Sequence, residues 1–87
     1  MFTYVYLLKS DSDGKFYVGC TSDLRRRIRD HNAGKSFATK GRRPFQLIYY
    51  EAHPNQKDAE ARELFFKSGW GRQYIQRVLR NHLKAKT

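Results

Sequence analysis

Two tyrosines near the start of the chain could form a chemically useful pair. Tyr6 and Tyr17 lie in two β-rich runs, residues 2–8 and 16–20, which turn-forming residues separate, and this pattern predicts an antiparallel hairpin. If Tyr6 pairs with Tyr17, the connecting loop is residues 10–13 and both phenol rings project from one face of the sheet. A phenol has an ordinary pKa of about 10, so it could act as a base at neutral pH only beside a cation.

A run of basic residues supplies such cations in a segment that predicts a helix over residues 24–33. Four of these residues are arginines: Arg25, Arg26, Arg27 and Arg29. Arg27 lies one turn before His31, so these two side chains share a face of the helix. A guanidinium can bind two oxygens of a phosphate, although a charged run is more often a solvated helix face. Most of these arginines are therefore expected on the surface, where they would contact phosphates without reading sequence.

A third group of candidates consists of carboxylates in a predicted helix over residues 56–68. Asp58, Glu60 and Glu63 lie there, and Glu60 and Glu63 share a face because they are three residues apart. A carboxylate can hold a hard divalent cation that keeps most of its waters. Spacing alone does not choose between the two glutamates, and the ordinary alternative for Glu63 is an ion pair with Lys67, four residues later.

The remaining pattern defines the elements that must position these groups. Residues 35–44 have no helical or strand period and predict a surface loop, residues 45–51 predict a third strand, and residues 72–83 predict a last helix. The expected fold is α+β, a three-stranded antiparallel sheet flanked by helices in the order ββαβαα. With 87 residues, the chain fits one domain spanning residues 1–87.

Apolar spacing predicts the buried side of each helix. The first helix should pack Leu24 and Ile28 against the sheet. The inward residues predicted for the other two helices are Ala61, Leu64 and Phe65, then Ile75, Val78 and Leu79. Phe66 and Trp70 are expected in the core.

A strong positive charge points to a polyanionic partner. The chain has 18 Lys and Arg against 8 Asp and Glu, a formal net charge of +10. Nucleic acid is the commonest partner of such a domain, with membranes and acidic proteins as rivals. The residues predicted to contact nucleic acid are Arg25, Arg26, Arg29, Lys35, Lys40, Arg42, Arg43, Arg72, Arg77 and Arg80.

Cysteine usage and hydropathy limit where the protein works. Cys20 is the only cysteine, so one chain can build neither a disulfide framework nor a cysteine-rich zinc site, and a reducing cytoplasm suits it. No stretch is apolar enough for a signal peptide or a membrane span. We therefore expect a cytoplasmic protein without a membrane partner, and a monomer.

In order and spacing these residues resemble the GIY-YIG nuclease superfamily over nearly the whole chain. Tyr4-Val5-Tyr6 and Tyr17-Val18-Gly19 look like its two signatures, although the first normally opens with glycine, and Arg27 falls the expected ten residues after Tyr17. Further similar segments are residues 21–24 with His31, residues 31–35, Pro44, residues 61–63 and residues 67–72. The chain is similar to small stand-alone members and to the N-terminal nuclease domain found in excinuclease ABC.

The resemblance implies a one-metal phosphodiesterase that acts on DNA, with RNA not excluded. Tyr17 would be the general base and Tyr6 would help to relay the proton, while Arg27 would stabilise the scissile phosphate. Glu63 would hold one divalent cation, Mg²⁺ or alternatively Mn²⁺. His31 would position the water or protonate the leaving oxygen; its ordinary alternative is a histidine that interacts with carbonyl groups at the helix end.

Two other functions fit parts of the pattern. A catalytically inactive nucleic-acid-binding module would use the same basic surface, but it has no need for a lone carboxylate near phosphate. A protein–protein adaptor would need exposed aromatic residues such as Phe66 and Trp70. A domain this small has no second module for reading sequence, so a protein partner or the shape of the DNA would supply any specificity.

Overall fold

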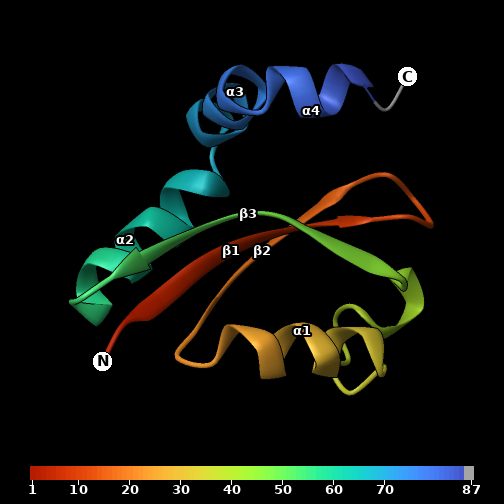
Figure 1. The fold of residues 1–87 in the computed structure, drawn as a ribbon, viewed down its shortest axis with the longest axis horizontal. Coiled ribbons are helices and arrows are strands. Elements are labelled where there is room, and N and C mark those ends of the chain that lie inside the picture. Colours follow the sequence, from red (N-terminus) through yellow and green to blue (C-terminus); the bar gives the residue numbers. More distant parts are fainter. Residues whose placement is uncertain (86–87) are drawn as a thin grey trace.

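A central antiparallel sheet organises the chain, whose residues 1–85 a computed structural model describes. Its strands are β1 (Thr3–Ser10), β2 (Phe16–Thr21) and β3 (Phe45–His53). They follow the order β2-β1-β3, with β1 antiparallel to both neighbours, and they twist strongly across one another (Figure 1). The predicted three-stranded antiparallel sheet is confirmed.

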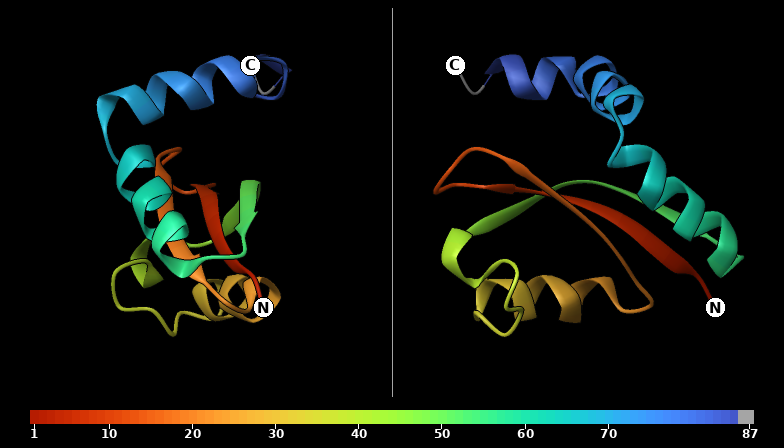
Figure 2. Two further views of the ribbon diagram at one scale, coloured as in Figure 1. Left: turned by 90° about the vertical axis from the view of Figure 1, so that its left-hand side faces the viewer. Right: turned by 180° about the vertical axis from the view of Figure 1, so that it is seen from behind.

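Helices cover both faces of the sheet. These elements are α1 (Leu24–Asn32), the 3₁₀ turn η1 (Lys40–Arg42), α2 (Gln56–Phe66), α3 (Gly69–Val78) and α4 (Arg80–Ala85). Helix α1 lies on one face, whereas α2 and α3 pack on the other (Figures 1 and 2). The predicted order ββαβαα is confirmed, although the last predicted helix is divided into α3 and α4.

The division occurs at Leu79, whose backbone angles (φ −106°, ψ 20°) depart from the helical range. Helix α3 also begins three residues earlier than predicted. Ser68 caps it, because its hydroxyl accepts a hydrogen bond from the backbone N–H of Gly71 at 3.2 Å. Gly69, which directly follows the predicted end of the second helix at residue 68, is therefore the first residue of the next helix.

The hairpin register differs from the predicted one by two residues. Tyr6 pairs with Gly19, and Tyr17 pairs with Leu8. The turn lies further along the chain than expected, at residues 11–15, and the buried hydroxyl of Ser10 stabilises it by accepting hydrogen bonds from the backbone N–H groups two and three residues later, at 3.0 and 3.1 Å. Since side chains alternate between faces, a shift of two residues leaves both tyrosines on the same face.

Strand β1 is buried on both of its faces, and this creates two apolar cores. Towards α2 and α3, the core contains Val5, Leu7, Val18, Ala59, Phe66 and Ile75. Towards α1, it contains Tyr6, Leu8 and Phe45, with Tyr17, Leu24, Ile28 and Leu47 packed against them. The predicted packing of α1 is confirmed.

The predicted buried side of α2 is wrong for Ala61 and Leu64, which are exposed, whereas Phe65 packs against the core as predicted. Leu64 is 72% exposed, and Ala59 and Phe66 are buried instead. The reason is a paired arginine: Arg62 faces inward, where its guanidinium lies 4.7 Å from the centroid of the Phe66 ring and bonds to Glu51 of β3. An apolar pattern does not reveal an arginine that is neutralised in the interior.

Two further burial predictions are wrong on α3. Val78 is 45% exposed and Trp70 is 76% exposed, whereas Ile75 and Phe66 are buried as expected. The side of α3 that meets the core is centred on Ile75, with Tyr74 and Leu79 packed beside it, and this packing leaves both Trp70 and Val78 exposed.

The Glu51–Arg62 contact joins β3 to α2. Arg62 donates to the two carboxylate oxygens at 2.9 and 2.6 Å, and the hydroxyl of Tyr49 and the ring of His53 also bond to this carboxylate. Chiefly through Arg62, these contacts lower the pKa of Glu51 to about 2. A bidentate pair with satisfied oxygens is favourable in a partly buried position.

We predict that this contact makes the fold sensitive to acid. The pKa of Glu51 is about 2 in the folded chain and 4.5 in the absence of partners, so the unfolded state binds more protons in this interval. The stabilisation is complete above about pH 5 and is lost as pH falls towards 2, up to about 3 kcal/mol. Urea unfolding of wild type and Glu51→Gln should show a stability difference that shrinks across this interval. Glu60→Gln, at an exposed carboxylate outside this contact, is the control, and a difference for Glu51→Gln that is constant with pH would contradict the assignment.

We predict that Gly71→Ala destabilises the fold. A Cβ at this position would collide with the carbonyl oxygen of Phe65 and the Cα of Phe66, so the start of α3 could no longer pass so close to the end of α2. Backbone atoms cannot move aside as a flexible side chain can, and overpacking of this kind costs roughly 1–3 kcal/mol. Gly69→Ala is the matched control because open space surrounds its Cβ position. Equal thermal midpoints for both variants would count against this close approach.

Candidate active site

Tyr6 lies at the centre of the candidate site. Its side chain is 1% exposed and lies on the face of the sheet that α1 covers. A Cβ on Gly19, its partner on β2, would overlap the hydroxyl end of the Tyr6 ring. Glycine at this position therefore lets the ring lie across β2. Sequence reasoning placed Gly19 in a motif without a role, because the register was needed to see this contact.

Tyr4, which stands where the first signature normally has glycine, lies two residues before Tyr6 on the same face. Its ring packs edge to face against Tyr50 of β3, with centroids 6.1 Å apart. The larger side chain therefore packs across the sheet towards β3, whereas Tyr6 reaches towards β2. The substitution leaves the position of Tyr6 intact.

His31 of α1 is fully buried and connects two hydroxyl groups. Its Nε2 lies 2.8 Å from the Tyr6 hydroxyl, and its Nδ1 lies 2.7 Å from the hydroxyl of Thr39. Both ring nitrogens are thereby occupied, so the alternative of a histidine that interacts with carbonyl groups at the helix end is wrong. Burial, and then the nearby positive charge of Arg27, lower the pKa of His31, which favours a neutral ring at neutral pH.

Thr39 is a residue of this cluster that sequence reasoning missed. It lies in the segment 35–44 that was predicted as a surface loop, yet it is fully buried. The segment is partly ordered by the turn η1, and it returns to α1 so that Thr39 reaches His31. No local pattern marks such a residue, because its partner lies on a different element.

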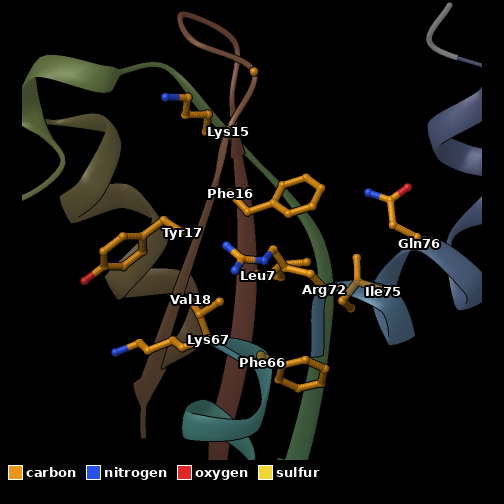
Figure 3. A pocket seen from close by; sticks show the side chains of 11 residues that line it. Leu7, Lys15, Phe16, Tyr17, Val18, Phe66, Lys67, Arg72, Ile75 and Gln76 are labelled. Atoms are coloured by element: carbon orange, nitrogen blue, oxygen red, sulfur yellow. The ribbon is translucent and has the colours of Figure 1, made fainter. Parts of the chain in front are cut away.

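Tyr17 lies against the other side of His31. The two rings meet edge to face with centroids 5.1 Å apart, and Tyr17 is only half-buried. Its side chain points towards α1 (Figure 3). The structure thus brings both signature tyrosines to one histidine, with Tyr6 enclosed and Tyr17 accessible.

Arg27 completes this cluster. Its guanidinium interacts with the Tyr6 hydroxyl, and this interaction is the main reason that the pKa of Arg27 is raised. Burial raises the pKa of Tyr6, and the contact with Arg27 offsets this only in part. Tyr6 therefore remains a neutral phenol at ordinary pH, with a cation beside its oxygen.

Glu63 approaches from the opposite face of the sheet, on α2, near the edge strand β2. Its carboxylate lies near the Cys20 thiol, and burial, followed by the effect of this carboxylate, raises the pKa of Cys20 to about 11. It also forms an ion pair with Lys67 at 3.0 Å, the ordinary alternative that the sequence allowed. In addition, it is near enough to Tyr6 to raise the pKa of that residue.

The two candidate glutamates differ in their surroundings. Glu60 is exposed and accepts a hydrogen bond from Gln56 at 3.0 Å. The charge of Glu60 raises the pKa of Cys20, whereas the charge of Glu63 raises the pKa of both Cys20 and Tyr6. Proximity to the tyrosine cluster therefore favours Glu63.

The donor set fits a magnesium-like ion better than a structural metal. Within residues 1–85, no group of three or more His, Cys, Asp or Glu side chains could hold a metal ion. A structural zinc site needs about four protein ligands. Mg²⁺ is commonly held by one or two carboxylates, with water and substrate phosphate as its other ligands, and a lone Glu63 meets that requirement.

The predicted nucleic-acid contacts fall into three groups. Exposed side chains on α1, α3 and α4 are Arg25, Arg26, Arg29, Arg72, Arg77 and Arg80. In the segment before β3, Lys35 lies 3.8 Å from Asp30, and Lys40 lies over the exposed Phe37 ring at 5.6 Å. The side chains of these two groups remain accessible to a phosphate backbone.

Arg42 and Arg43, the third group, are held by the fold itself. Arg42 pairs with Asp13 at 2.7 Å and donates to the carbonyl of Phe16 at 3.3 Å, so it fastens the segment before β3 to the hairpin. Arg43 donates to the carbonyl of Lys40 at 2.7 Å. Both contacts give these arginines a structural role beside any role in binding.

Among the helices of residues 1–85, none combines the length and apolar character that crossing a bilayer requires.

Comparison with known proteins agrees with this geometry. The sequence matches the GIY-YIG catalytic domain over residues 2–76. A UPF0213 protein from Clostridium perfringens is 37% identical over 82 residues, which cover 93% of this chain and 87% of that protein. A UPF0213 protein from Haloquadratum walsbyi is 42% identical over 66 residues, covering 75% of this chain and 73% of that protein.

A solved structure is also similar. The solution NMR structure of a UPF0213 protein from Bacillus halodurans superimposes with a TM-score of 0.57 at 36% identity, covering 90% of this chain and 85% of that chain. The family match includes both tyrosines, Arg27, His31 and Glu63. The chain therefore belongs to the GIY-YIG nuclease family.

Proposed function

We propose that this protein is a metal-dependent endonuclease that hydrolyses phosphodiester bonds in DNA, with RNA not excluded. The observation that carries the proposal is the meeting of Tyr6, Tyr17, Arg27 and His31 on one face of the sheet, with the carboxylate of Glu63 on the other face still near enough to raise the pKa of Tyr6. A binding surface alone has no need for a buried, hydrogen-bonded phenol cluster next to a carboxylate. The cytoplasmic location expected from the single cysteine stays a prediction.

The two tyrosines take different roles because their environments differ. Tyr6 is enclosed and its pKa is raised, so it keeps its proton and orients the groups around it. Tyr17 is the accessible phenol and is the proposed general base, which takes a proton from the attacking water. The positive charge of Arg27 stabilises any negative charge that develops on the hydroxyl oxygens of Tyr6 and Tyr17.

His31 acts as a positioning residue in this proposal. A neutral ring that bonds to Tyr6 on one side and to Thr39 on the other holds the Tyr6 hydroxyl in place. A fully buried ring with both nitrogens occupied is poorly suited to protonate a leaving oxygen directly. We therefore favour orientation over acid catalysis for His31.

Arg27 and Glu63 would act on the phosphate. Arg27 is partly exposed, so its planar fork can bind two phosphate oxygens and stabilise added charge. Glu63 would hold one divalent cation, Mg²⁺ or Mn²⁺, which supplies neutralisation of charge at the phosphate when bound. Lys67 shares the carboxylate of Glu63, so its ammonium would compete with the cation.

The second candidate is a catalytically inactive nucleic-acid-binding module of the same fold. The Lys67–Glu63 ion pair is the specific observation in its favour, because a carboxylate engaged by lysine needs no metal. The net charge of +10 serves both functions equally. A partner protein that supplies specificity, and a monomeric state, are compatible with either function.

We predict that Tyr17→Phe and Glu63→Gln each lower DNA cleavage roughly 100-fold or more, because each removes a group needed in the transition state. Purified protein is incubated with labelled single-stranded, duplex and branched DNA, with and without Mg²⁺ or Mn²⁺. Binding at low salt should change less than about two-fold, since the basic surface is intact. Glu60→Gln is the matched control and should cut normally.

Two outcomes of this assay would decide against the mechanism. Equal cutting by wild type and both variants would mean that neither residue contributes. Binding without cutting on any substrate would favour the inactive module.

We predict that Thr39→Val lowers kcat about ten-fold with little change in KM, because the loss of a hydrogen bond leaves His31 and hence Tyr6 less well oriented. Thr39→Ser keeps the hydroxyl and should restore most of kcat. If Thr39 served only the fold, both variants would have a lower thermal midpoint, and the kcat of the valine variant would not fall below that of the serine variant. If the valine and serine variants cut equally, the Thr39–His31 contact has no part in catalysis.

A further inference from the structure

A cavity of about 580 Å³ lies between the hairpin and α3, on the face of the sheet opposite α1 (Figure 3). Its floor is apolar and is formed by Leu7, Val18, Phe66 and Ile75. The volume falls within the roughly 300–1,000 Å³ that is typical of sites for small organic groups. None of the residues placed in the catalytic cluster except Tyr17 lines it.

The half-buried Phe16 provides an aromatic wall. Its ring points into the cavity from β2, and the amide of Gln76 lies at the opposite rim on α3 (Figure 3). An aromatic ring accepts the flat face of a nucleobase whatever its sequence, and a glutamine amide can both donate to and accept from the edge of a base. This combination suits one nucleobase better than an aliphatic chain.

The rim of the cavity carries positive charge. Lys15, Lys67 and Arg72 line it, all three are exposed, and the part of the chain described contributes no acidic side chain to the lining. The apolar floor suits a flat ring, and the rim, whose charged side chains are all cationic, suits a phosphate. A nucleotide carries both groups. A peptide without acidic side chains or a neutral small molecule would bring no anionic partner for Lys15 and Arg72.

The cavity also borders the proposed catalytic centre. Tyr17 is among its lining residues, although its ring points towards α1, and Lys67 connects the rim to the Glu63 carboxylate at 3.0 Å. A nucleotide held here would therefore lie beside a phosphodiester that reaches the tyrosine cluster. The neighbouring phosphate could pass around the edge of β2, since β2 is an outer strand of the sheet.

We propose that this cavity receives the base of one unpaired nucleotide next to the cleaved bond, stacked on Phe16, with its phosphate held by Arg72 and Lys67. The inference rests on the proposed function because it places the nucleotide relative to that centre. A base in a duplex is stacked and paired, so it can enter only after it leaves the helix. The cavity thus favours single-stranded or frayed DNA over intact duplex.

The test measures binding without cleavage. A fluorescent ten-nucleotide single strand and the duplex of the same sequence are titrated with the full chain in EDTA at low salt. Phe16→Leu keeps apolar volume but removes the ring, and Arg72→Gln removes the cation. Each should weaken binding of the single strand about ten-fold and binding of the duplex less than two-fold. Phe16→Tyr keeps the ring and should restore affinity.

Arg77→Gln is the matched control, because it removes one charge from α3 outside the cavity lining. It should weaken the single strand and the duplex equally, and circular dichroism checks that each variant is folded. Equal losses on both ligands for Phe16→Leu and Arg72→Gln would overturn the proposal. If the protein cuts DNA but the variants lose affinity for both ligands equally, the nuclease proposal stands and the cavity proposal fails. If the variants lose affinity mainly for the single strand but the protein does not cut, the cavity proposal stands and the nuclease proposal fails.

Discussion

Tyr6 places a phenol where the fold has excluded water, and a buried hydroxyl must find a partner there. The partner is His31, at 2.8 Å, and this requirement fixes where α1 lies on the sheet. His31 in turn needs a partner for its second nitrogen, which brings Thr39 and the segment before β3 against the helix. On the other side, the ring fits only because Gly19 has no side chain. One buried hydroxyl therefore organises the strand pair, the first helix and the following segment.

Carboxylates are few in this chain, and three of the eight serve the fold through specific contacts. Glu51 joins β3 to α2 through Arg62, Asp13 holds Arg42, and Asp23 caps α1 by accepting from the backbone of its first turn. Glu63 differs because its neighbours include Tyr6, a group with a raised pKa. Perturbed titratable groups that gather without need for stability are typical of functional sites.

The parts of the fold that sequence could predict are those with a local cause. Strand alternation placed Tyr6 and Tyr17 on one face even though the register was two residues out, because the error preserved parity. The buried side of α2 was missed because Arg62 faces inward with a partner from β3, a contact that no periodicity reports.

In the candidate site, too, the residues with a local sequence signal could be predicted and those without one could not. Tyr6, Tyr17, Arg27 and His31 were found from their family-like spacing along three consecutive elements, and the structure brings them together. Thr39 and the cavity beside Phe16 were not predictable, since each depends on how distant segments meet in space. The angle between α3 and the hairpin, for example, has no local signal.

The candidate site lies at the edge of the sheet because its residues come from both faces of the sheet. Tyr6 and Tyr17 face α1, whereas Glu63 and the cavity lie on the side of α2 and α3. Groups on opposite faces of a sheet are separated by its backbone and can converge only around an outer strand, which here is β2. A phosphodiester chain is long and narrow, so it can follow that edge and meet both sets of groups. The position of Gly19 on β2 keeps this passage thin, because a side chain there would displace the Tyr6 ring from the edge.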